Sequence, residues 1–182
     1  MNTKKNKLDI TSMTKISLCV AILCASSYLV IPLPFSPIVL TLHTIIINLV
    51  GLILKPKEAA YTLLTYIAMG LIGLPVFAGG TSGPGKLFGP TGGFYFGFLF
   101  AVIIISLLKG KEIHLKRYVL LTICVGIPIQ HLFAVLFMCF YNDFHLLSAI
   151  MTVSLPFLLG DVIKAIIASI LAKTLNKSIP SK

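Results

Sequence analysis

Apolar stretches, each about long enough to cross a lipid bilayer, follow one another along most of this chain. A helix needs about 20 apolar residues to span the hydrocarbon core, and charge or Pro and Gly mark the ends of such stretches. Hydrophobic residues make up 57% of the 182 and charged residues only 11%, whereas a soluble domain is about 45 to 50% apolar. We therefore expect an all-α polytopic membrane protein, one transmembrane domain over residues 1–182. The six predicted helices are 16–31, 38–54, 59–77, 91–108, 118–140 and 154–172.

The Lys and Arg residues are distributed unevenly between the two sets of loops. Cytoplasmic loops carry the excess of these residues, and thirteen of the fifteen fall in the two termini and in the second-to-third and fourth-to-fifth connections. The opposite side has Lys86 alone, and Lys164 lies inside the last stretch. The pattern predicts that both termini are cytoplasmic.

The residue of greatest functional interest is Lys164, which lies roughly ten residues into the last predicted helix, or about 15 Å deep. An ammonium at that depth costs at least a few kcal/mol unless it is paired or hydrated. Asp161 lies three residues earlier, on the same helical face, and Lys164 can reach back to it. We expect a neutral pair facing an outward-opening cavity; a purely structural ion pair is the alternative.

A Gly-rich connection leads into the fourth predicted helix. It ends in Pro90, Thr91, Gly92 and Gly93, and the free N–H groups at a helix N-terminus favour an anion such as a carboxylate. Small residues at a helix start also permit close helix packing. The residues leave these two interpretations equally open.

Two motif matches in this connection are excluded by the residues around them. Residues 80–87 read GTSGPGKL, but Leu87 replaces the Ser or Thr of a nucleotide-binding loop and no strand precedes it. Gly80 to Gly83 spell GTSG, the nucleophile signature of intramembrane rhomboid proteases, with His131 in a later helix. Ser82 is followed by Gly83 and Pro84, so we expect it in a loop rather than at the start of a buried helix.

Other polar and small residues carry weaker signals. His43 and His131 are predicted to form hydrogen bonds between helices, because a metal site needs three or four convergent ligands. We expect no metal and no cofactor. Ala21 and Ala25 place two small residues on one face of the first helix, where another helix, inside or outside this bundle, could approach closely.

Two segments together resemble a known family. Gly73–Ala78 (GLPVFA) leading to Gly89–Phe94 (GPTGGF), and Gly160–Lys164 (GDVIK), are similar to the signatures of the BioY proteins. These are the biotin-specific S components of energy-coupling-factor (ECF) transporters. Length and layout agree, so the resemblance covers nearly the whole chain.

The resemblance implies the six-helix S-component fold and a protein that is not an enzyme, in the plasma membrane of a bacterium. It implies a biotin pocket that opens outward, where Asp161 and Lys164 contact the ligand. It also implies that Ala21 and Ala25 match the alanine motif that docks S components on the transmembrane coupling subunit. ATP would be used only by separate ATPase subunits.

The chemistry of biotin suggests how it would lie in such a pocket. The neutral Asp161 and Lys164 pair offers an acceptor and a donor that match the ureido head. We expect the carboxylate tail to point outward, toward the amides of Gly92 and Gly93. Aromatic side chains would flank the ring, namely Phe77, Phe94 or Tyr95.

Two rival functions come from other classes of protein. One is a self-contained channel or secondary carrier, although no inverted repeat is visible to support it. The other is an intramembrane hydrolase built on Ser82, which would need its base in fixed geometry.

Overall fold

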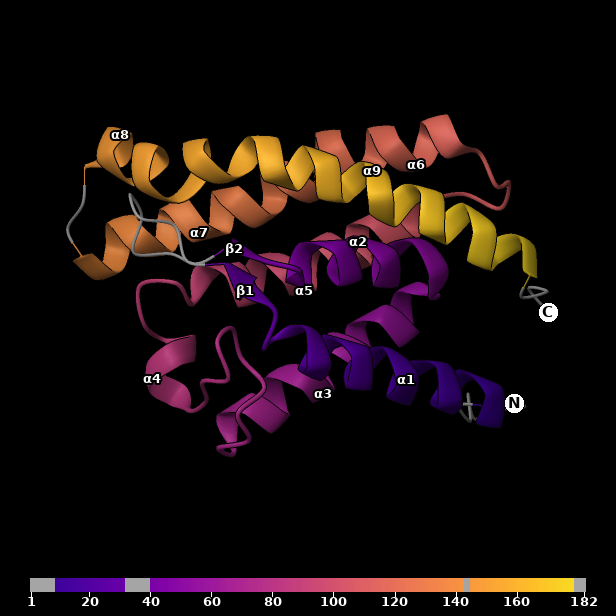
Figure 1. Ribbon diagram of the computed structural model, residues 1–182, viewed down its shortest axis with the longest axis horizontal. Helices are drawn as coiled ribbons and strands as arrows, with labels where there is room; N and C mark the ends of the chain where they lie inside the picture. Colours follow the sequence, from indigo (N-terminus) through magenta and orange to yellow (C-terminus); the bar gives the residue numbers. More distant parts are fainter. Residues whose placement is uncertain (1–8, 32–39, 143–144, 179–182) are drawn as a thin grey trace, which may run out of the picture.

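The computed structural model describes residues 9–31, 40–142 and 145–178. Over these residues the chain is a bundle of helices with one short antiparallel strand pair (Figure 1). The first half contains α1 (Ile10–Ser26), β1 (Val30–Ile31), β2 (Leu40–Thr41), α2 (His43–Ile53), α3 (Pro56–Leu71), α4 (Pro84–Leu87) and α5 (Gly93–Leu108). The second half contains α6 (Leu115–Leu121), η1 (Thr122–Gly126), α7 (Ile127–Asn142), α8 (Leu146–Ala149), η2 (Ile150–Ser154) and α9 (Leu155–Ser178), where η marks a π-helical turn.

Helices lie in each of the six predicted stretches, which confirms the all-α class. Of the described helices, two are long and apolar enough to cross a membrane by length and composition, namely Leu115–Tyr141 and Leu146–Ser178. Three others are apolar but shorter: Ile10–Ser26, His43–Ile53 and Gly93–Leu108. The number of membrane crossings therefore stays a prediction.

The first three helices differ in their bounds from the prediction. The first was placed at 16–31, but α1 ends at Ser26, and Val30–Ile31 instead pairs with Leu40–Thr41 as a strand. Hydrophobicity alone cannot separate these cases, because a two-residue strand and a helix end are equally apolar here.

Local signals explain both ends of α3. It begins at Pro56, and the Glu58 side chain accepts a hydrogen bond from the Lys55 backbone N–H at 3.0 Å. It ends at Leu71 rather than at the predicted Phe77, because Gly73 adopts a φ of +102°. The Leu74 N–H then bonds to the Met69 carbonyl at 3.1 Å, which closes the helix with a Schellman motif.

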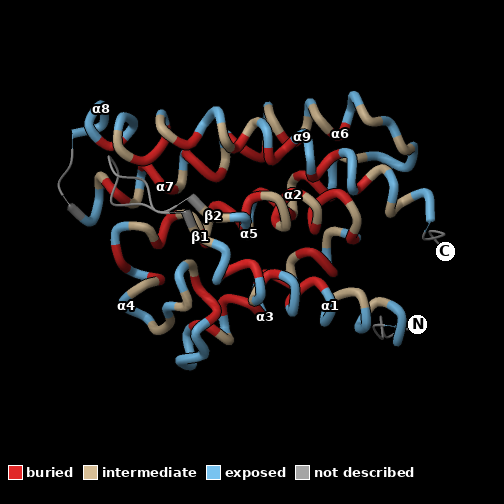
Figure 2. Tube along the Cα trace, in the orientation of Figure 1, coloured by how far each residue is buried: buried red, intermediate tan, exposed pale blue. Residues whose placement is uncertain are grey.

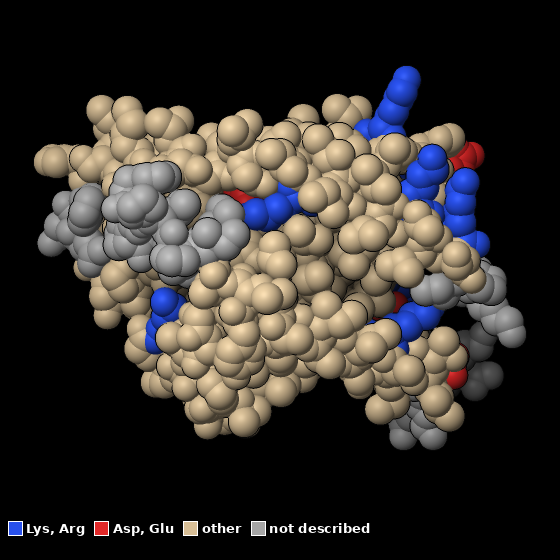
Figure 3. Space-filling view, in the orientation of Figure 1, with Lys and Arg blue, Asp and Glu red and all other residues tan. Residues whose placement is uncertain are grey.

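Both termini lie at one end of the bundle, α4 and α8 lie at the other, and the strand pair lies between the two ends (Figure 1). Lys and Arg side chains gather at the end that holds the termini (Figure 3). Buried residues follow the inner faces of the helices, and outward faces are exposed (Figure 2). Those outward faces are apolar, as with Phe140 at 93% and Leu159 at 76% exposure, which suits a surface in contact with lipid.

Helix α5 is central, because it packs against α2, α3 and α7. Glycines allow it to approach α7 closely. A Cβ atom at Gly93 would lie 2.3 Å from the Phe133 carbonyl oxygen, and one at Gly97 would lie 2.9 Å from the Gln130 Cα. The sequence left Gly93 open between anion binding and packing; its position against α7 is a packing contact.

We expect Gly93→Ala to destabilise the bundle, because the new methyl group meets the backbone of α7 rather than a flexible side chain. Overpacking of this kind costs about 1 to 3 kcal/mol. Thermal unfolding of the detergent-purified protein, followed by circular dichroism, should show a lower midpoint. Gly85→Ala is the matched control, because nothing lies within 4 Å of its added Cβ. Equal midpoints for the two variants would contradict close packing at Gly93.

Candidate functional site

A cavity of about 310 Å³ opens among α2, α5, α9 and the connection that contains α4. Its lining includes Lys86 of α4, an element that lies at the end of the bundle away from the termini (Figure 1). Most of its wall is apolar and aromatic, with a few polar groups. The polar and aromatic residues in the wall are Thr41, His43, Thr81, Lys86, Thr91, Phe94, Tyr95, Phe98, Phe157, Asp161 and Lys164.

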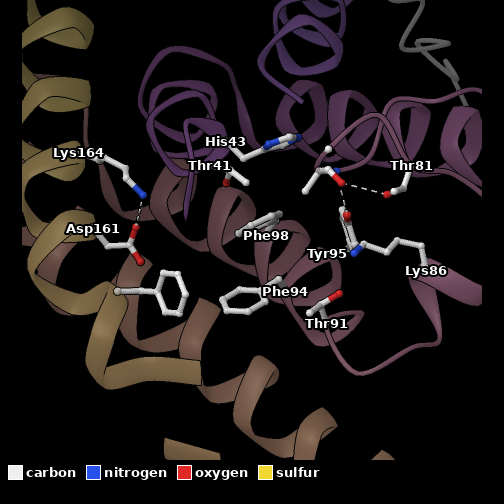
Figure 4. Close-up of a pocket in the computed structure, with 13 residues that line it drawn as sticks. Thr41, His43, Thr81, Lys86, Thr91, Phe94, Tyr95, Phe98, Asp161 and Lys164 are labelled. Atoms are coloured by element: carbon white, nitrogen blue, oxygen red, sulfur yellow. Dashed lines mark hydrogen bonds and ion pairs between the residues drawn. The ribbon is translucent and has the colours of Figure 1, made fainter. Parts of the chain in front are cut away.

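The predicted pair of charges lies in this wall. The Lys164 Nζ donates a hydrogen bond to the Asp161 Oδ1 at 2.8 Å (Figure 4). The two residues are only 7% and 4% exposed. The contact confirms the spacing argument, because residues three apart on a helix share one face.

Two other helices also bind the Asp161 carboxylate. The Thr44 hydroxyl of α2 donates to Oδ1 at 3.1 Å, and the His131 Nε2 of α7 lies 3.1 Å from Oδ2. The other ring nitrogen of His131 lies 3.1 Å from the hydroxyl of Ser154, in the π-helical turn η2. Three helices therefore converge on one carboxylate, which fixes its position before any ligand arrives.

The predicted role of the two histidines as links between helices is confirmed. His131 joins α7 to α9, and the His43 Nε2 lies 2.8 Å from the Tyr66 hydroxyl, which joins α2 to α3. The Tyr66 hydroxyl donates in turn to the Val76 carbonyl at 3.0 Å. His43 also contributes to the cavity wall.

The N-terminal end of α5 and the residues just before it supply part of the predicted ligand site. Thr91 and Phe94 line the cavity, whereas the described lining does not include Gly92 or Gly93. The Gly92 N–H already bonds to the Gly89 carbonyl at 2.8 Å. Among the aromatic candidates, Tyr95 lines the cavity. Phe77 is fully buried behind it, and the centroids of the Phe77 and Tyr95 rings are 4.5 Å apart.

The sequence pattern does not indicate the contributions of Lys86 and Thr44 to the site. Lys86 marks the outer side in the charge pattern, and in the structure it reaches the cavity wall from α4. A lone cation on the side that disfavours Lys and Arg was the available signal. Thr44 had no signal, because its partner Asp161 lies 117 residues away in the sequence.

Ser82 and the alanines of α1 lie outside this cavity wall. His131 bonds to Asp161 and Ser154, and among the described residues no hydrogen bond joins it to Ser82. Ala21 and Ala25 are exposed on α1. The part of the chain that the structure describes has no group of three His, Cys, Asp or Glu side chains placed to hold a metal ion.

The chain matches the family model described as the BioY family over residues 1–181. It is 34% identical over 172 residues to "Biotin transporter BioY2" of Lactococcus lactis subsp. cremoris, covering 92% of this chain and 91% of that protein. It is also 34% identical over 148 residues to "Biotin transporter BioY" of Thermotoga maritima, covering 81% and 86%.

One solved structure has the same fold. It is the crystal structure of the S-component for biotin from an ECF-type ABC transporter, with a TM-score of 0.82 and 24% identity. The match covers 95% of this chain and 94% of that one.

We expect strong thermodynamic coupling between the two buried charges. Asp161→Leu leaves the Lys164 ammonium without its counter-ion, and removing one partner of a buried pair typically costs about 3 to 5 kcal/mol. The double variant, Asp161→Leu with Lys164→Met, removes both charges, so it should lose less stability than Asp161→Leu alone. The ligand-free unfolding midpoint measures this. A double variant that is as unstable as the sum of both single variants would show that the pair is not coupled.

Proposed function

This chain belongs to the BioY family, and from that premise we propose that it is the biotin-binding subunit of an ECF-type uptake transporter. Two matched relatives are named as biotin transporters, and the fold is that of an S-component. The observation that carries the proposal is the buried Asp161 and Lys164 pair in the wall of an aromatic cavity.

The hydrogen-bonding capacity left on this pair fits the ureido head of biotin. A carboxylate has about four acceptor sites. Within the described residues, Asp161 Oδ1 is used by Lys164 and Thr44, and Oδ2 is used by His131. One site on Oδ2 therefore remains for a ureido N–H. In the part of the chain that the structure describes, the Lys164 ammonium uses one of its three donors, which leaves two for the ureido carbonyl. The pair is thus satisfied by protein groups and can still accept a polar ligand.

The rest of the proposed ligand site surrounds this pair. Phe94 would contact the apolar thioether ring, and Thr91 would face the tail. Gly92 and Gly93 would serve the site by the close packing that holds these two side chains at the cavity wall. Such a site, largely apolar with a few convergent polar groups, is the common form of small-molecule pockets.

We further propose that residues 1–182 form one domain that crosses the bacterial plasma membrane six times, with both termini in the cytoplasm. The gathering of Lys and Arg at the end with the termini supports this orientation (Figure 3). The cavity, whose wall includes Lys86 of α4, would then open outward.

Ala21 and Ala25 would form the contact with the membrane coupling subunit, since both are exposed on α1. Small side chains there permit close approach of a partner helix. ATP hydrolysis would take place on separate ATPase subunits, with biotin as the transported ligand and no cofactor in this chain. Membrane lipid would cover the remaining apolar outer faces.

Calorimetric titration of the detergent-purified protein tests the ligand. Biotin should bind tightly and thiamine should not. Asp161→Asn and Lys164→Ala should each weaken biotin binding about 10- to 100-fold, because a hydrogen bond to a charged group is worth about 1.5 to 3 kcal/mol. Lys177→Ala is the matched control, because Lys177 is an exposed cation on the same helix. Dethiobiotin, which keeps the ureido head, should also bind.

Full affinity for biotin in Lys164→Ala would remove this pair from the ligand site. Equal binding of thiamine would reject biotin as the preferred ligand. Ester cleavage that disappears in Ser82→Ala would favour the hydrolase, and biotin uptake by vesicles that hold this chain alone would favour the self-contained carrier.

A further inference from the structure

Lys86 is presented to the cavity by a short, well-anchored turn. Gly83 adopts a φ of +89° and donates its N–H to the Gly70 carbonyl at the end of α3, at 2.8 Å. Pro84 then begins α4. Leu87 is only 2% exposed and fixes the turn on the bundle, while its neighbour Lys86 contributes to the cavity wall.

The cavity has polar groups at both ends. Figure 4 shows Asp161 and Lys164 on one side and Lys86 on the other, with the rings of Phe94, Tyr95 and Phe98 between them. All six residues are in the cavity wall. A ligand that fills this space would therefore meet a pair of opposite charges at one end, a single ammonium at the other, and an apolar middle.

The ammonium of Lys86 has no acidic partner among the described residues. No carboxylate lies within 4 Å of it there, whereas the Asp161 carboxylate is held by Lys164 and His131. The described wall thus contains one carboxylate and two ammonium groups, which leaves an excess of one positive charge. An apolar surrounding strengthens the attraction of such a charge for an anion.

Two neutral donors lie at the same end of the cavity. The Tyr95 hydroxyl accepts a hydrogen bond from the Ala78 N–H at 3.3 Å, and its own proton has no acceptor among the described residues. The Thr91 hydroxyl also makes no hydrogen bond within the described chain and lies in the wall. The Gly92 N–H, by contrast, is already used by Gly89.

From this arrangement, and resting on the function proposed above, we propose that Lys86 binds the free carboxylate of the ligand. With the ureido head on Asp161 and Lys164, the tail crosses the aromatic middle and ends at Lys86, with the hydroxyls of Tyr95 and Thr91 as further donors. Lys86 then selects ligands with a free carboxylate over their neutral amides.

The test compares biotin with biotinamide, in which a neutral amide replaces the carboxylate. Wild-type protein should bind biotin at least about tenfold more tightly than biotinamide, because a charge-assisted hydrogen bond is lost. Lys86→Met should lower the affinity for biotin by a similar factor and lower the affinity for biotinamide much less, so the preference disappears. Lys86→Arg, which keeps the charge, should retain it.

Different results of this experiment would reject the role of Lys86 and the proposed function. Unchanged biotin preference in Lys86→Met, with tight biotin binding intact, rejects the role of Lys86 but not the proposed function. If Lys164→Met removes the preference instead, the ligand lies in the opposite direction. Wild-type protein that binds neither compound rejects both proposals. The ligand-free unfolding midpoint of Lys86→Met should match that of wild type, which separates lost recognition from lost folding.

Discussion

A carboxylate and an ammonium buried side by side on α9 impose the strictest demand on this fold. Removing such charges from water costs on the order of several kcal/mol per ion, and good geometry is needed to offset it. Asp161 therefore requires the hydroxyl of Thr44 on α2 and the ring of His131 on α7, both at 3.1 Å. Helices α2, α7 and α9 must hold one relative arrangement for this to occur. The cavity lies beside this junction, so its polar end is fixed by the same contacts.

Close helix packing makes that arrangement possible. Gly93 and Gly97 of α5 lie directly on the backbone of α7, which brings α7 to the distance at which His131 can reach α9. In a lipid environment the hydrophobic effect does not drive helices together, so small residues and polar bonds between helices take that role. The glycines at the start of α5 thus act on the site through geometry.

Contacts within one helix could be predicted from the sequence, whereas contacts between helices could not. The pairing of Asp161 with Lys164 was predictable, because three residues along a helix always bring side chains to one face. The pairing of Asp161 with His131 was not, because it depends on the rotation of α7 against α9. The end of α3 needed the positive φ of Gly73, a turn signal inside an apolar run. Lys86 lies on the side that disfavours cations, and this position in the sequence is itself evidence for a role beyond topology.

A cavity with charged groups at both ends has a consequence for selectivity. A ligand that matches only the head leaves the Lys86 ammonium without a counter-ion, and one that matches only the tail leaves the donors of Lys164 and one acceptor site of Asp161 unused. Each matched end contributes hydrogen bonds to charged groups, so a ligand that matches both ends binds more tightly than one that matches either end alone. A monoanion with a ureido head satisfies both ends and cancels the excess charge of the wall. Selectivity then arises from the distance between the two ends, which α9 and the turn around α4 set independently.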